Sequence, residues 1–171
     1  NLHASNKMLQ LIAQTPQWKI MLDQGVFIPV EITNNQTKDN TEFTMTPILV
    51  PHRDELSDMH AFILRGQNRS LLYLPDHDTW DETLAMYNAD NVRQWFKDLA
   101  IDIALIDGTF WSSEELQSRS QDKIPHPPIK PPHFLSSLPH LPSKELFLRG
   151  FMDLGSPTAS SCPGGRHFTL T

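Results

Sequence analysis

Three side chains that could take part in catalysis stand at or just beyond the ends of apolar, β-branched runs. These are His52, Asp76 and Asp107. Imidazole and carboxylate groups are ligands for divalent ions such as zinc, manganese and iron. A rigid sheet fixes the backbone at a strand end, while the loop that follows leaves the side chain free to reach a ligand. The pattern therefore indicates a metal or catalytic site at one edge of a sheet.

The neighbours of these residues add to the candidate ligands, although each has an ordinary structural interpretation as well. Asp76, His77 and Asp78 could supply oxygen and nitrogen ligands, but they also fit a turn closed by an aspartate side chain. Loop, cap or turn roles are equally open for His52, His60, Asp107 and His126. The sequence contains no H-E-x-x-H, P-loop, G-x-G-x-x-G or G-x-S-x-G motif that would decide between these interpretations.

The elements that must position these residues follow from hydrophobic periodicity. A helical pattern covers 7–22, with a break or kink at Pro16, and a second covers 81–99, with Asp90 as a possible N-cap. Between and after them, apolar or β-branched runs predict strands at 26–32, 43–50, 61–64, 70–74 and 101–106. The runs 61–64 and 70–74 are typical of a β-hairpin, because the connection between them contains Gly66 and Asn68.

Composition limits the class of protein. The 171 residues suit one domain or a large part of one, and the net charge of −6 gives no electrostatic reason to expect nucleic-acid binding. A single cysteine excludes an intrachain disulfide framework and a cysteine-rich zinc site. No apolar run approaches the roughly 18 residues that span a bilayer. Because the sequence opens on Asn1 without an initiator methionine or a signal segment, we interpret it as the interior of a longer chain.

Proline is concentrated near the end of the chain. Half of the 14 prolines lie between Pro125 and Pro142, which excludes a central strand or a regular helix there. The segment 150–171 is rich in Gly, Ser and Pro and has no periodicity. We therefore expect one domain over 1–143 and an atypical tail over 144–171, in loop or disordered conformation.

Four blocks of sequence, in this order, resemble the metallo-β-lactamase fold superfamily, and within it the proteins similar to pyrroloquinoline quinone biosynthesis protein B. The blocks are Thr46-Pro47-Ile48-Leu49-Val50-Pro51-His52-Arg53-Asp54-Glu55, Ser70-Leu71-Leu72-Tyr73-Leu74-Pro75-Asp76-His77-Asp78-Thr79-Trp80, Ala104-Leu105-Ile106-Asp107-Gly108-Thr109-Phe110-Trp111 and Ile124-Pro125-His126-Pro127. The resemblance extends from about Leu2 to about Ser143 and implies an α/β fold, an αββα sandwich with one or two metal ions at the sheet edge.

The resemblance also implies roles for individual residues. Asp76 matches an aspartate that commonly bridges two metal ions, so we expect it to be a metal ligand. Asp107 and His126 match residues near the reaction centre and are expected to be catalytic, as an acid–histidine pair that moves protons. His52 matches a histidine of a strand–loop junction, for which a supporting role behind the ligands is expected. The cofactor implied is a divalent metal, zinc by preference.

The main ligand cluster of the superfamily, His-x-His-x-Asp-His, has no counterpart in this sequence, nor does its last metal-binding histidine. We therefore interpret the chain as the C-terminal part of the fold, with the N-terminal portion missing, and expect it to be inactive and to bind zinc weakly or not at all by itself. The parent protein is expected to be a cytoplasmic hydrolase that acts on a small molecule through metal-activated water or oxygen. An organellar address in the missing segment would change that location. A non-catalytic scaffold and a ribonuclease Z-like phosphodiesterase are the alternatives, and we expect no membrane partner.

Overall fold

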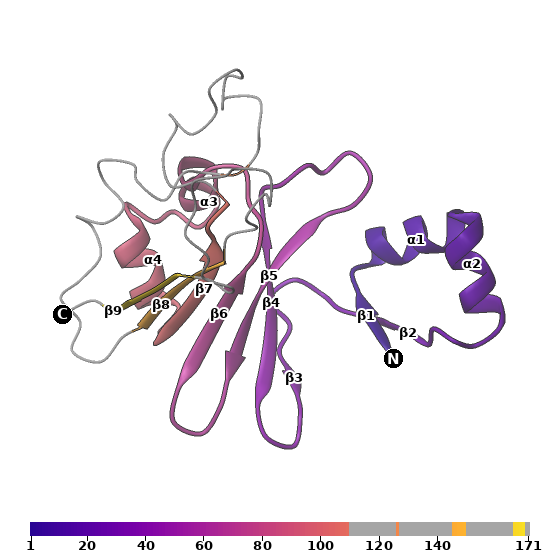
Figure 1. Ribbon diagram of the computed structural model, residues 1–171, viewed down its shortest axis with the longest axis horizontal. Helices are drawn as coiled ribbons and strands as arrows, with labels where there is room; N and C mark the ends of the chain where they lie inside the picture. Colours follow the sequence, from indigo (N-terminus) through magenta and orange to yellow (C-terminus); the bar gives the residue numbers. More distant parts are fainter. Residues whose placement is uncertain (110–125, 127–144, 150–165, 170–171) are drawn as a thin grey trace, which may run out of the picture.

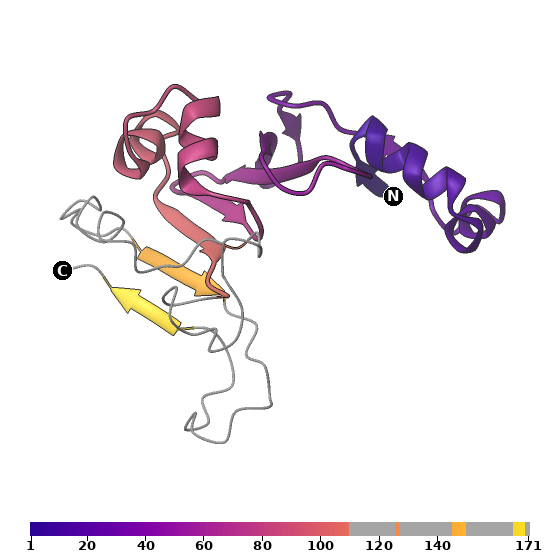
Figure 2. The same ribbon diagram turned by 90° about the horizontal axis from the view of Figure 1, so that it is seen from above.

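The computed structural model describes residues 1–109, His126, 145–149 and 166–169. Within them a seven-stranded sheet carries two helices on one face, and a smaller N-terminal unit with two helices lies beyond one end of the sheet (Figures 1 and 2). No helix in these described ranges is both long enough and apolar enough to cross a membrane.

The N-terminal unit is built from four short elements in the order strand, helix, helix, strand. They are β1 (Leu2–Ala4), α1 (Asn6–Gln14), α2 (Pro16–Asp23) and β2 (Pro29–Glu31). The break expected at Pro16 is confirmed, because this proline occupies the first turn of α2, where no backbone N–H is required. The strand predicted over 26–32 is shorter than expected, since it pairs only with the three residues of β1.

The seven strands of the main sheet lie side by side in chain order. They are β3 (Lys38–Asp39), β4 (Thr44–Val50), β5 (Met59–Arg65), β6 (Ser70–Leu74), β7 (Ile103–Asp107), β8 (Glu145–Arg149) and β9 (Arg166–Thr169). Strand β5 is antiparallel to both β4 and β6, whereas β6, β7 and β8 are parallel. The carboxyl ends of β4, β6 and β7 therefore lie on the same side of the sheet, as the sequence predicts. We call this row of strand ends the carboxyl edge of the sheet.

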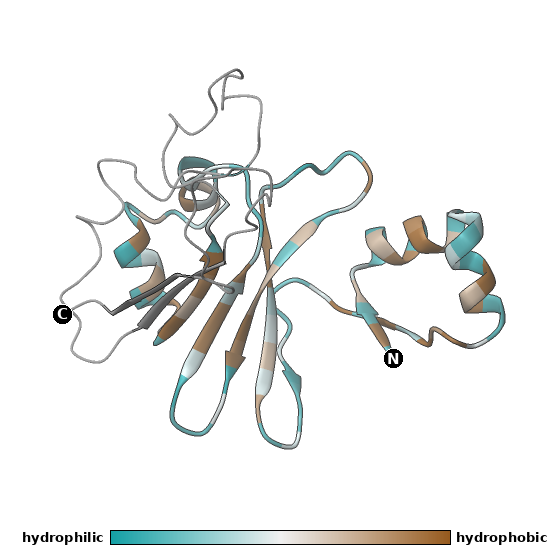
Figure 3. Ribbon diagram, viewed as in Figure 1, coloured by the Kyte–Doolittle hydropathy of each residue, from teal (hydrophilic) through white to brown (hydrophobic). Residues whose placement is uncertain are grey.

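Helices α3 (Trp80–Met86) and α4 (Val92–Asp98) cover one face of this sheet (Figure 2). A buried row crosses the strands beneath them, formed by Ile48, Ala61, Ile63, Leu72, Leu74, Ala104 and Ile106. Brown strand segments in Figure 3 mark these apolar stretches. Trp95 of α4 is 2 % exposed and packs on this row, so it is the main anchor between helix layer and sheet.

The single helical pattern predicted over 81–99 forms two helices rather than one. Asn88, between them, has a positive φ of 51°, a left-handed conformation that does not continue an α-helix. The second helix is capped by Asn91, whose side chain accepts a hydrogen bond from the Gln94 backbone, and not by Asp90. The N-cap of the first is Thr79, which accepts from the Glu82 backbone.

The tail is the part of the fold where the expectation is wrong. Residues Glu145–Arg149 and Arg166–Thr169, expected in loop or disordered conformation, form β8 and β9 at the edge of the sheet. The run Leu146-Phe147-Leu148 is short and apolar, and its register against β7 supplies the backbone hydrogen bonds that the sequence pattern alone does not reveal. The boundary between 1–143 and 144–171 stays a prediction. The proline-rich stretch, apart from His126, lies outside the described residues.

Tyr87 joins the helix layer to the sheet and gives the fold a dependence on alkaline pH. Its hydroxyl donates a 2.6 Å hydrogen bond to the Leu49 carbonyl, and burial raises the pKa of Tyr87 to about 12, above the ordinary 10.0. Since the folded chain favours the neutral phenol, stability should be fully present below pH 10 and fall as the pH rises toward 12. We expect urea unfolding of the Tyr87→Phe variant to lose this part of the pH dependence. Parallel curves for the two proteins over that range would contradict the prediction.

Candidate metal centre

Two carboxylates converge at the sheet edge because their strands are neighbours. Strands β6 and β7 are parallel, with Leu74 opposite Ile106. Asp107 ends β7, and Asp76 follows β6 after one proline. The sheet therefore brings together two acidic side chains that are 31 positions apart in sequence.

Asp107 is held in one orientation. Its residue is 4 % exposed, and one carboxylate oxygen, Oδ1, accepts hydrogen bonds from the backbone N–H of Thr109 at 2.9 Å and from the Thr109 hydroxyl at 2.7 Å. These two bonds form the kind of local turn that Asp and Thr favour. The second oxygen, Oδ2, takes no part in this turn and faces His126, the third member of the site.

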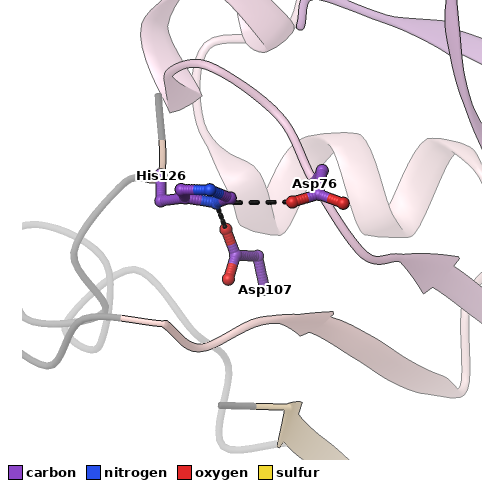
Figure 4. A group of neighbouring side chains, drawn as sticks. All are labelled: Asp76, Asp107 and His126. Atoms are coloured by element: carbon purple, nitrogen blue, oxygen red, sulfur yellow. Dashed lines mark hydrogen bonds and ion pairs between the residues drawn. The ribbon is translucent and has the colours of Figure 1, made fainter. Parts of the chain in front are cut away.

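His126 lies between the two carboxylates (Figure 4). Its Nδ1 atom lies 2.7 Å from Asp107 Oδ2 and 3.4 Å from Asp76 Oδ1. The histidine side chain is 25 % exposed and that of Asp76 is 35 % exposed, whereas that of Asp107 is 2 % exposed. The site therefore has a buried wall, formed by Asp107, and an accessible side, formed by the other two.

This arrangement fits a divalent cation. Asp76, Asp107 and His126 each offer a ligand atom, and the three atoms lie within 4.8 Å of one another. Two carboxylate oxygens and one imidazole nitrogen suit zinc, manganese or iron. Asp107 Oδ2 takes no part in the Thr109 hydrogen bonds and faces His126. These three residues are the ones that would hold the metal.

A second pair of polar groups lies beside these ligands. His52 Nδ1 and Asp78 Oδ1 are 3.2 Å apart, and neither atom forms a hydrogen bond within the described part of the chain. The His52 ring lies 5.9 Å from the ring of His126, centre to centre. A backbone hydrogen bond of 2.8 Å from Asp78 to the Pro51 carbonyl ties the two loops together. The structure thus places His52 next to the ligand group, where a supporting role is feasible.

His77 and His60 do not join the group of ligand atoms. The His77 side chain is completely buried beneath α3, where loss of solvent lowers the pKa of its imidazole to about 4, although the nearby Asp107 opposes that shift. Its Nδ1 atom lies 3.1 Å from the hydroxyl of Thr83. His60 is buried within β5, and this burial lowers its pKa as well. The suggestion that His77 supplies a ligand beside Asp76 and Asp78 therefore finds no support in this geometry.

The sequence predicts the residues of this centre but not all of the residues that orient them. Asp76, Asp107 and His126 are brought together, and His52 lies beside them. Their individual roles as metal ligand, catalytic pair and support stay predictions. Thr109, which orients Asp107, is not among the candidate residues from the sequence, although Asp107-Gly108-Thr109 is typical of a turn closed by side-chain hydrogen bonds.

The mixed sheet, the helices on one face and a cluster of acidic and histidine side chains at the strand ends define a metallo-β-lactamase-like α/β fold. Comparison with solved structures agrees. The chain is similar to Zn(2+)-bound PqqB from Methylobacterium extorquens, with a TM-score of 0.55 and 15 % sequence identity over 76 % of this chain and 46 % of that protein. It thus spans less than half of that relative. The low identity means that this similarity establishes the fold and not the activity.

Other comparisons add less. The metallo-beta-lactamase fold protein YhfI from Bacillus subtilis matches with a TM-score of 0.41 and 13 % identity, over 64 % of this chain and 39 % of that protein. No protein-family model and no curated protein sequence matches the chain.

Proposed function

We propose that this chain is part of a metal-dependent hydrolase-type enzyme in which Asp76, Asp107 and His126 hold a divalent cation. The observation that carries the proposal is the convergence of their three ligand atoms within 4.8 Å at the carboxyl edge of the sheet. Zinc is the preferred ion, because imidazole and carboxylate are among its usual ligands and because the relative of similar fold, PqqB, is described as Zn(2+)-bound. A bound zinc ion lowers the pKa of a coordinated water, so that hydroxide is present near neutral pH.

The residues around the cation would have distinct tasks. Asp107, oriented by Thr109, would be the fixed ligand, whereas the more exposed Asp76 can adjust its position when a ligand or substrate arrives. His52 would keep the neighbouring loop in place through its contact with Asp78. The accessible side, formed by Asp76 and His126, is where a substrate would approach. The net charge of −6 disfavours a nucleic-acid substrate and favours a small molecule.

His126 has two possible functions, and a substitution separates them. As a ligand it would contribute directly to cation affinity, whereas as a proton carrier paired with Asp107 it would affect only turnover. The proximity of its Nδ1 to both carboxylates favours the ligand role. We therefore expect His126→Gln to weaken zinc binding by about tenfold or more in a calorimetric titration of the 171-residue chain. Equal zinc affinities of variant and parent would assign His126 to proton transfer instead.

Zinc binding by this chain alone should be weak. Among the residues that the structure describes, the centre offers two carboxylates and one imidazole, and two further donors beside it, His52 and Asp78, contact each other. We expect the zinc content after dialysis against a weak chelator to fall well below one equivalent, measured by atomic absorption. One full equivalent retained after that dialysis would show that the chain already holds a complete metal site.

Enzymatic activity is best tested in the longest natural protein that contains this sequence. We expect it to hydrolyse small ester or amide substrates in a chelator-sensitive reaction that added zinc restores. Asp76→Asn should lower turnover at least a hundredfold. Asp23→Asn is a matched control, since Asp23 is an exposed aspartate that pairs with Lys19 on α2. Zinc binding without turnover of any substrate in a broad panel would favour a scaffold with the same fold.

A further inference from the structure

His77 is a buried polar side chain that the proposed metal centre does not use. Its ring is completely buried and meets the edge of Trp80, with the ring centres 4.4 Å apart. Its Nε2 atom is buried and has no hydrogen-bond partner among the described residues. An apolar ring would fill the same space without leaving a nitrogen unpaired, so packing alone does not account for an imidazole here.

A hydrogen bond to Thr83 anchors the His77 ring. His77 Nδ1 lies 3.1 Å from the Thr83 hydroxyl, and which of the two groups donates depends on the tautomer of the ring. The Thr83 hydroxyl also lies 2.9 Å from the Thr79 carbonyl. The ring is thus tied to the first turn of α3.

The two neighbours of His77 in sequence face the other way. Asp76 contacts His126, and Asp78 contacts His52, whereas His77 contacts α3. Because His77 lies between the two aspartates in the chain, a ring held against α3 restricts the directions in which the Asp76 and Asp78 carboxylates can point. Rotation of this segment would remove His77 from its buried hydrogen bond at the same time as it moved both carboxylates.

We propose that His77 is a positioning residue of the metal centre, and that its anchored ring sets the direction and separation of the Asp76 and Asp78 carboxylates. This inference rests on the proposed metal-binding function. It assigns to His77 an action through its neighbours, with no contact between His77 and the cation or the substrate.

Four variants of the 171-residue chain test this role. His77→Phe keeps an aromatic ring but removes its hydrogen bond to Thr83. His77→Asn keeps a polar group near the position of Nδ1. Thr83→Val removes the hydroxyl that His77 contacts. Val92→Ala is the matched control, because Val92 is buried in the same core but belongs to α4. Thermal unfolding of each variant measures the loss of stability, so that effects on the centre can be compared at equal stability.

Two measurements report on the centre. The first is the zinc dissociation constant from calorimetry, and the second is the hydrogen-exchange rate of the Asp78 amide, which donates to the Pro51 carbonyl at 2.8 Å. We expect His77→Phe and Thr83→Val to weaken zinc binding by about tenfold and to speed Asp78 exchange similarly. His77→Asn should keep the zinc affinity and the Asp78 exchange rate close to those of the parent. The double variant, His77→Phe with Thr83→Val, should bind zinc no more weakly and exchange no faster than His77→Phe alone.

The outcomes separate this inference from the function on which it rests. If the longest natural protein that contains this sequence binds no zinc, the proposed function fails, and Asp78 exchange alone then decides the role of His77. The positioning role is overturned if both measurements for His77→Phe and Thr83→Val stay within twofold of the parent. It is also overturned if Val92→Ala shifts them as much at an equal loss of stability, because the effect would then be general loosening of the core.

Discussion

Replacing Asp107 with asparagine is expected to weaken zinc binding by the chain about a hundredfold. Asparagine has nearly the same shape, and its amide oxygen can still accept the hydrogen bonds from Thr109 that orient this side chain. What it lacks is the negative charge facing His126, in a side chain that is only 2 % exposed. Losing one partner of a buried charge pair costs about 3 kcal/mol or more, which corresponds to at least a hundredfold in affinity.

The measurement is a calorimetric zinc titration of parent and variant at the same pH and salt concentration. Asp23→Asn serves as the control, because it removes a negative charge from the exposed surface, where Asp23 pairs with Lys19. Its zinc affinity should match that of the parent within twofold. If Asp107→Asn and Asp23→Asn behaved alike, Asp107 would be a structural turn residue and not a ligand.

Replacing Trp95 with alanine is expected to lower the free energy of unfolding by about 4 kcal/mol. Trp95 is 2 % exposed, and its indole contacts three other aromatic rings, those of Trp80, Tyr87 and Phe96. Truncation at this position would leave a large cavity between α4 and the sheet. Because the sheet carries Asp76 and Asp107, two of the three proposed ligands, at its strand ends, partial unfolding of the variant at room temperature is expected also to remove zinc binding.

Trp95→Phe is the informative comparison for this prediction. The indole Nε1 is buried and has no hydrogen-bond partner among the residues that the structure describes, so phenylalanine removes an unsatisfied donor while it keeps most of the ring. We expect Trp95→Phe to lower the free energy of unfolding by less than half as much as Trp95→Ala does. Urea unfolding followed by tryptophan fluorescence measures both. If Trp95→Ala lost less than about 1 kcal/mol, α4 would not be anchored to the sheet as described.

The sequence predicts the sheet well where a local pattern and a local turn agree. The hairpin of β5 and β6 and the strand of β7 carry their own signals, namely apolar runs bounded by Gly66, Asn68 and a terminal aspartate. The carboxyl edge could therefore be located before any coordinates were known. Strands β8 and β9 could not, because β8 pairs with β7 across 42 positions of the chain and β9 pairs with β8 across 18 to 24 positions.

The candidate site is predictable in membership but not in geometry. Residue types and strand ends indicate Asp76 and Asp107, yet no local pattern gives their distance from His126, which is 19 positions beyond Asp107 in the chain. The orientation of His77 is a further example. Sequence alone groups it with its acidic neighbours, whereas burial beneath α3 turns it away from them.

The most direct test of the central claim, that Asp76, Asp107 and His126 form one cation site, is a zinc titration of the chain followed by long-range ¹H–¹⁵N spectra of its histidine rings. We expect the ring nitrogens of His126 to shift first and to saturate at one equivalent, while the solvent-accessible His3 stays unchanged. The shift should disappear when Asp76 and Asp107 are both replaced by asparagine. A His126 signal that does not respond to zinc, or that responds equally in the double variant, would contradict the claim.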